Sequence, residues 1–107
     1  MTTFDDREKG FEKKFAHDAE LKFKAESRRN KMLAEWAGAK MGMAADQIAE
    51  YVKEVRRADL EEAGDDDVFR KVRADLDAKS VAVSDQELRD QMHEFLAKAV
   101  AEVEATS

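Results

Sequence analysis

Apolar residues recur at three- and four-residue steps along most of the chain, which is the period of an α-helix with one buried face. The pattern is clearest near the C-terminus, where a capping box of Ser84 and Glu87 opens a predicted helix over about residues 85–103. A preceding series predicts a helix over roughly 66–78, with the Asp65 side chain as its N-cap. The apolar faces of these two helices consist of Val68, Phe69, Val72 and Leu76, and of Leu88, Met92, Phe95, Leu96, Ala99 and Val103.

Two more helical segments come earlier in the chain. Residues 45–64 carry one apolar face, and the first forty residues form a single long helical pattern that Gly42 is expected to close. Gly38 and Gly42 have the spacing of a GxxxG motif, which outside a lipid-facing helix indicates a loosening helix end rather than a packing contact. The apolar faces of these segments consist of Leu21, Ala25, Met32, Trp36 and Ala39, and of Ile48, Tyr51, Val52, Val55 and Leu60. The chain is therefore predicted to be all-α, a small antiparallel four-helix bundle with short connections.

The first residues carry an aromatic face that does not continue into this bundle. Phe4, Phe11 and Phe15 lie on one side of a helix, but the same line then meets Asp18 and Lys22. This aromatic face is also displaced by about 60° around the helix axis from the apolar face that follows it. The phenylalanines are therefore not simply the beginning of the core helix.

The length of the opening pattern leads to the same conclusion. At 1.5 Å per residue, Phe4 would lie ~48 Å from Trp36 along a continuous helix, which is more than the later helices can cover. Gly10 lowers helix stability by about 1 kcal/mol relative to Ala, which favours a segment that is frayed when free and helical when bound. We expect a mobile N-terminal helical arm over residues 1–18 and a four-helix bundle over residues 19–107.

Composition supports the helical class and excludes some functions. A chain of 107 residues is long enough for one domain at most. Its composition, with 43% apolar residues, 41% charged residues and no proline, is typical of amphipathic helices. The absence of cysteine excludes disulfides and thiolate chemistry, and the net charge of −6 argues against nucleic-acid binding. Asp5, Asp6 and Glu8 stand where a signal peptide needs a basic start, and no apolar run is long enough for a membrane span. We expect a cytoplasmic protein.

Candidate catalytic residues are scarce. Asp90 and His93 have a spacing used in di-iron bundles, but the second such motif and the further carboxylates are missing, so His93 is interpreted as a surface or boundary residue. The triple Asp at residues 65–67 is interpreted as a helix start, because it lacks the glycine and the distal glutamate of a calcium loop. The sequence gives little support for an enzyme and predicts no cofactor.

One basic cluster leaves two interpretations open. Arg28, Arg29 and Lys31 could bind a phosphate or an acidic partner, and a nucleotide-sensing module would use Arg28 and Arg29. They could instead form a charged helix edge that faces acidic residues of a neighbouring helix, and this is the interpretation that we favour.

The aromatic face of the arm has three explanations. It could fold back onto the bundle, lie on a membrane surface, or insert into a groove on another protein. Asp5, Asp6, Glu8 and Glu12 oppose binding to anionic lipid, and a compact bundle with a separate arm suits an interaction protein.

Three long motifs then identify a family resemblance. The segments FDDREKGFEKKFAHDAELKFKAESRRNKMLAEWAG, VRRADLEEAGDDDVFRKVRADLDA and VSDQELRDQM resemble the ζ subunit of the alphaproteobacterial F-type ATP synthase over nearly the whole chain. The resemblance implies a four-helix bundle with an N-terminal inhibitory arm that suppresses ATP hydrolysis. It implies binding to the α and β subunits of the catalytic head, with γ as a further candidate, at the interface between catalytic and non-catalytic subunits. The protein would be a monomer when free and peripheral to the inner membrane when bound.

The resemblance also implies which residues bind the partner. Two departures from the family pattern are Gly10, which is expected to lower arm helicity, and Ala44, where a capping Ser is usual. An alternative function is a helical adaptor or nucleotide-sensing module that uses Arg28 and Arg29. The implied partner-binding residues are Thr2, Thr3, Phe4, Asp5, Arg7, Glu8, Lys9, Phe11, Lys14 and Phe15.

Overall fold

The computed structural model describes residues 19–60 and 65–106, and in these residues it contains four helices and no strand. The predicted all-α class and four-helix bundle are confirmed. The predicted arm over residues 1–18 lies outside the described residues, so the division into an arm and a bundle stays a prediction. The helices are α2 (Ala19–Lys40), α3 (Ala45–Ala58), α4 (Asp66–Ala78) and α5 (Asp85–Thr106).

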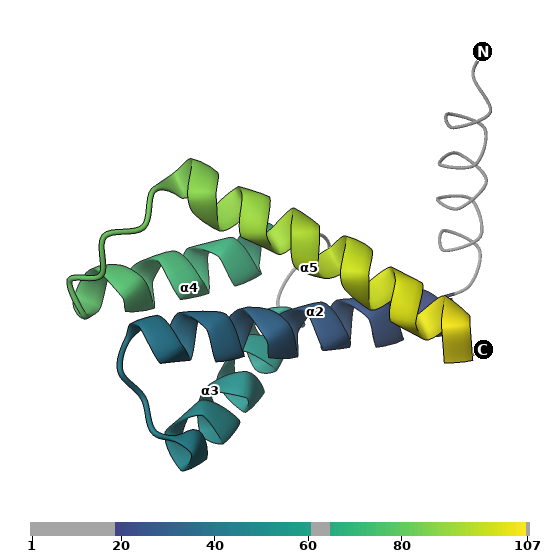
Figure 1. Ribbon diagram of the computed structural model, residues 1–107, viewed down its shortest axis with the longest axis horizontal. Helices are drawn as coiled ribbons and strands as arrows, with labels where there is room; N and C mark the ends of the chain where they lie inside the picture. Colours follow the sequence, from purple (N-terminus) through teal and green to yellow (C-terminus); the bar gives the residue numbers. More distant parts are fainter. Residues whose placement is uncertain (1–18, 61–64, 107) are drawn as a thin grey trace.

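Helix α2 is the centre of the bundle, because it contacts each of the other three helices. It runs antiparallel to α5, and the two long helices lie side by side, whereas α3 and α4 lie mainly against the C-terminal half of α2 (Figure 1). The bundle therefore has a four-helix end and a two-helix end. The two-helix end pairs the N-terminal half of α2 with the C-terminal half of α5.

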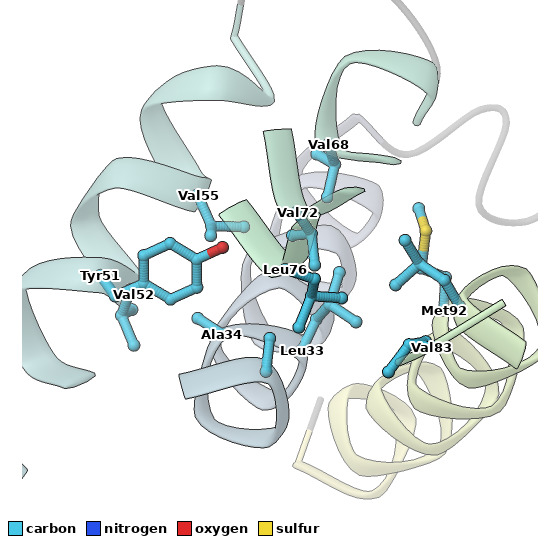
Figure 2. Close-up of a cluster of buried hydrophobic side chains, with 12 residues drawn as sticks. Leu33, Ala34, Tyr51, Val52, Val55, Val68, Val72, Leu76, Val83 and Met92 are labelled. Carbon is cyan, nitrogen blue, oxygen red and sulfur yellow. The ribbon is translucent and has the colours of Figure 1, made fainter. Parts of the chain in front are cut away.

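The main core fills the four-helix end. Side chains from all four helices converge there (Figure 2), and Leu33, Val55 and Leu76 have no exposed surface. The apolar face predicted for α4 is confirmed, since its members are buried or pack against this core. The buried residues of the cluster are Leu33, Ala34, Ala37, Tyr51, Val52, Val55, Val68, Val72, Leu76, Val83, Leu88 and Met92.

A second, smaller core lies at the two-helix end. Ala25 of α2 and Val103 of α5 are buried there, and Leu21, Leu96 and Val100 pack around them while remaining partly exposed. Only two helices supply this cluster, so few of its side chains are fully enclosed.

The ends of α2 and α4 are closed in the same way. Gly42 has a positive φ of 76°, and the Met43 N–H donates to the Gly38 carbonyl at 2.9 Å, as in a Schellman motif. Ser80 has a positive φ of 56°, and the Val81 N–H donates to the Leu76 carbonyl at 2.9 Å. The prediction that Gly42 ends the first helix is confirmed.

Gly38 has a different role from the one the spacing predicted. It lies inside α2, and a Cβ added to it would approach Cγ1 of Ile48 to 2.9 Å. The interpretation as a loosening helix end is therefore wrong, because the missing side chain lets α3 approach α2 closely.

The helix starts confirm one predicted cap and correct another. The Glu87 N–H donates to Oγ of Ser84 at 3.0 Å, as the capping box predicts. Asp65 makes no side-chain cap bond at the start of α4, so that part of its predicted role is wrong. Its carboxylate instead lies near the guanidinium groups of Arg29 and Arg89, because a cation attracts a carboxylate more strongly than a neutral N–H does.

The buried face of α2 also differs from the prediction. Met32 and Trp36 are only half-buried and Ala39 is exposed, whereas the polar residues Arg29 and Asn30 are buried. Because α2 contacts three helices, a large part of its circumference is buried. A charged residue such as Arg29 can lie in this buried part because it forms an ion pair there.

Leu60, predicted to lie on the apolar face, is 74% exposed. The reason is that α3 ends at Ala58, so the chain no longer follows the helical face at this residue.

Candidate functional site

The structure describes only part of the predicted site. Arg28 and Arg29 lie on α2. The ten residues predicted to bind the partner lie outside the described residues, and they are Thr2, Thr3, Phe4, Asp5, Arg7, Glu8, Lys9, Phe11, Lys14 and Phe15.

Arg29 is the most buried charged residue in the described part of the chain, with 2% of its surface exposed. Its Nη2 lies 3.7 Å from Oδ1 of Asp59, and its Nη1 lies 3.7 Å from Oδ2 of Asp65. Its Nε donates to Oδ1 of Asn30 at 2.7 Å, and Nδ2 of Asn30 donates to Oδ2 of Asp59 at 2.9 Å. The charge of Arg29 is thus compensated inside the protein, as a buried charge requires.

Arg89 extends this arrangement to α5. Its Nη1 lies 3.7 Å from Oδ1 of Asp65, and its Nη2 donates to Oδ1 of Asp66 at 3.0 Å. Its guanidinium also stacks on the ring of Phe69, 3.9 Å from the ring centre. We call the group Arg29, Asn30, Asp59, Asp65 and Arg89 the ion network. It joins α2 to the ends of α3 and α5 and to the residue that precedes α4.

Arg28 points away from the ion network. It is exposed, and its Nη1 lies 3.4 Å from Oε1 of Glu102 on α5. Both arginines of the predicted basic cluster therefore face acidic residues of neighbouring segments, as the favoured interpretation of the sequence expects. To reach a phosphate, Arg29 would have to leave Asp59 and Asp65, and no contact of the described residues favours this. The nucleotide-binding role stays a prediction, which a titration with ATP or ADP followed by amide shifts can test.

The electrostatics around the ion network affect Glu26. Burial raises the pKa of the Glu26 carboxyl above its ordinary value, and the negative charge of Asp59 raises it further. Lys22 and Arg29 act in the opposite direction but do not cancel these effects. The surroundings of Glu26 therefore disfavour its charged form.

The described residues offer no obvious catalytic or metal chemistry. His93 is exposed on α5, as expected of a surface residue. Across residues 19–60 and 65–106, no three His, Asp or Glu side chains are placed to hold a metal ion. None of the helices in those ranges is long and apolar enough to cross a membrane.

The sequence pattern did not predict one surface feature. Phe23 and Leu60 line a groove of about 380 Å³ between α2 and the end of α3, which we call the α2–α3 groove. Phe23 shares a helix face with Ser27 and Asn30, which contact the C-terminal part of α3. The sequence shows only that Phe23 lies off the apolar face predicted for the first helix. Its exposure could not be predicted from that, because it depends on where α3 ends.

The fold and these surfaces define a small all-α bundle in which a buried ion network joins the helices and an apolar groove remains open. The chain belongs to the family described as ATPase inhibitor subunit zeta, whose sequence pattern matches residues 1–102. The resemblance inferred from the sequence motifs is thereby confirmed.

A solved structure is also similar. A protein determined by solution NMR is 39% identical to this chain, and the alignment covers 81% of this chain and 99% of that protein, with a TM-score of 0.70. No curated protein matches the sequence.

Proposed function

We propose that this protein inhibits ATP hydrolysis by the catalytic head of a bacterial F-type ATP synthase. The observation that carries the proposal is the family match, which begins at residue 1 and therefore includes the N-terminal segment as well as the bundle. The partners are the α and β subunits of the head, together with γ if the arm reaches the rotor. The protein acts in the cytoplasm, at the periphery of the inner membrane, without a cofactor and without catalysis of its own.

In the proposed mechanism, residues 1–18 form a helix in the cleft between a catalytic and a non-catalytic subunit. Phe4, Phe11 and Phe15 fill apolar pockets there, since their spacing places them on one face of the helix. The polar and charged residues Thr2, Thr3, Asp5, Arg7, Glu8, Lys9 and Lys14 make the surrounding contacts. Hydrolysis requires the cleft to open and close, so a helix wedged in it stops turnover.

The energetics require strong anchors. Ordering each backbone residue costs on the order of 1–2 kcal/mol, and burying one Phe side chain gains about 1.5–3 kcal/mol. Three phenylalanines on one face therefore supply a large part of the binding free energy, with the remainder from hydrogen bonds and ion pairs. The bundle contributes a folded base to which the arm is attached directly at Ala19.

The test is inhibition of ATP hydrolysis by the purified catalytic head, with full-length variants. Loss of one Phe anchor in Phe11→Ser should weaken inhibition by about tenfold or more, because at least 1.4 kcal/mol of binding is lost. The triple variant Phe4→Ser, Phe11→Ser, Phe15→Ser should not inhibit.

Lys13→Ser is the matched control, because Lys13 lies on the opposite side of the same helix. It should inhibit nearly as well as the unaltered protein. Circular dichroism checks that the bundle is intact in each variant. Inhibition by the triple variant at the potency of the unaltered protein would contradict the proposed role of the arm.

A further inference from the structure

The α2–α3 groove carries the two exposed large apolar side chains of the described residues. Phe23 is 62% exposed and Leu60 is 74% exposed. A single exposed apolar residue is common on protein surfaces, but Phe23 of α2 and Leu60, which follows the end of α3, line the same groove and give it exposed apolar surface. Because α3 ends at Ala58, no helix of the described chain covers Phe23.

One side of the groove is basic. Lys53, Arg56 and Arg57 of α3 all line it and are exposed. Nε and Nη2 of Arg56 both lie 3.4 Å from the Ser27 carbonyl oxygen, which holds this guanidinium across the groove wall. Among the described residues, Lys53 pairs with the exposed Glu50 at 3.3 Å, and such surface pairs are weak. Arg57 makes no ion pair with another described residue.

Two carboxylates, those of Glu26 and Asp59, also line the groove. The Asp59 side chain is only 10% exposed, accepts a hydrogen bond from Asn30 and pairs with Arg29. Glu26 is half-buried, and burial raises the pKa of its carboxyl. Among the described residues that line the groove, three exposed cations therefore stand against two partly buried carboxylates, so the charge of this lining is positive on a chain whose net charge is −6.

We propose that the α2–α3 groove binds an amphipathic helix of a partner protein. The apolar side chains of that helix pack against Phe23 and Leu60, and its carboxylates pair with Lys53, Arg56 and Arg57. Helices dock in such grooves through apolar anchors three or four residues apart, and flanking charges fix their orientation. This interaction goes beyond the proposed inhibition by the arm, because it uses only residues of the bundle.

Charge complementarity favours this occupant over a second copy of the chain. A symmetric dimer places the same patch on both subunits, so the three cations of one rim would face those of the other. A small molecule is also less suitable, because a groove of about 380 Å³ lies near the lower end for ligand sites and is open to solvent.

The experiment is a titration of the isotope-labelled full-length protein, followed by amide NMR shifts, with two synthetic helical peptides. Both peptides carry the same leucine face, and their flanks carry glutamate in one and lysine in the other. The glutamate peptide should shift amides around residues 23–30 and 53–60 saturably, and less so at high salt. The lysine peptide should not.

Variants then locate the contact. Arg57→Glu and Leu60→Ser should each weaken binding of the glutamate peptide by about tenfold, the effect of losing 1.4 kcal/mol. Lys98→Glu makes the same charge change on an exposed residue of α5 and should bind normally. Both altered groove residues are exposed, so the bundle should remain folded, which circular dichroism verifies.

Several results would overturn the proposal. These are equal binding of both peptides, no binding of the glutamate peptide at millimolar concentration, or binding unaffected by Leu60→Ser. A dimer in sedimentation that Leu60→Ser dissociates would assign the groove to a second copy. The groove amides could also shift in the Phe4→Ser, Phe11→Ser, Phe15→Ser variant when no peptide is present. That result would assign the α2–α3 groove to this chain's own N-terminal segment.

Discussion

The two ends of the bundle use the same pair of long helices but enclose them very differently. At the four-helix end, α3 and α4 cover α2, and Leu33, Val55 and Leu76 lose all contact with solvent. At the two-helix end, the buried apolar residues are Ala25, Ala99 and Val103, within a rim of partly exposed apolar residues. The ion network lies between these regions, where α3 ends and α4 begins.

From this difference we expect the number of neighbouring helices, rather than hydrophobicity, to set how stable each end is. A helix pair alone cannot surround its side chains, so each apolar residue there buries less area and contributes less free energy. The N-terminal segment joins the bundle at this less enclosed end, at Ala19. We expect stability to be graded from one end to the other, and the following predictions test this gradient.

The largest effect should come from the boundary between the two ends. Arg29→Ala leaves Asp59, whose side chain is only 10% exposed, without its cation and leaves Asp65 with Arg89 alone, and breaking a buried pair in this way costs about 3–5 kcal/mol. The neighbouring Arg28→Ala removes only an exposed pair with Glu102 and should cost about 1 kcal/mol or less. Urea unfolding of both variants measures the contrast, and similar losses would refute it.

Removal of apolar side chains should show the gradient directly. Leu76→Ala in the four-helix core should destabilise by about 2–5 kcal/mol, because a cavity remains among fully buried neighbours. Leu21→Ala at the two-helix end should cost about 1 kcal/mol or less, since that side chain is already partly exposed. Thermal and urea unfolding test this pair, and equal losses would mean that the two ends are equally enclosed.

A backbone change far from the two-helix end should have a moderate stabilising effect. Ser80 holds a φ of 56°, which glycine adopts without steric cost, so Ser80→Gly should stabilise the protein by about 0.5–1 kcal/mol. Amide hydrogen exchange should then slow for the core amides of α4, while the first turn of α2 should be unaffected if it opens locally. Equal slowing of amide exchange at both ends would show that the bundle opens as one cooperative unit, and it would contradict the stability gradient.

The smallest effects should appear in the pH dependence, with a different pH window for each end. Burial, helped by Asp75, raises the pKa of Tyr51 in the four-helix core, so the unfolded chain loses this proton first. Stability should therefore fall as pH rises above about 10, and Tyr51→Phe should reduce that fall.

At the two-helix end, the raised pKa of Glu26 means that the folded protein holds this proton more tightly than the unfolded chain. Its contribution to stability should be present below about pH 4 and should be lost as pH rises through the raised folded pKa. Glu26→Gln should therefore be slightly more stable than the unaltered protein at pH 7 and similar to it at pH 3. Urea unfolding at both pH values measures this, and lower stability at pH 7 would contradict it.

Much of the fold follows from local sequence signals. The period of Val68, Val72 and Leu76 defines one face of α4, and the Ser84 cap and the Gly42 turn mark a helix start and a helix end. Each signal depends on residues within one or two turns of the chain, so it can be recognised without knowledge of the neighbours. The family resemblance carried by the long motifs is confirmed for the same sequence, over residues 1–102.

Contacts between the helices determine which side chains are buried and which apolar side chains stay exposed. Arg29 is charged, so no hydrophobic pattern could place it inside, and its burial depends on Asp59 and Asp65, which lie 30 and 36 residues further along the chain. Gly38 is a close contact only because Ile48 comes to face it. Leu60 is exposed because α3 has already ended, and together with Phe23 it leaves an open groove. Local patterns in the chain are enough to locate the helices and to identify the family resemblance, because periodicity, caps and motifs involve residues close together in the sequence. Long-range packing determined the buried charges and the exposed apolar surface.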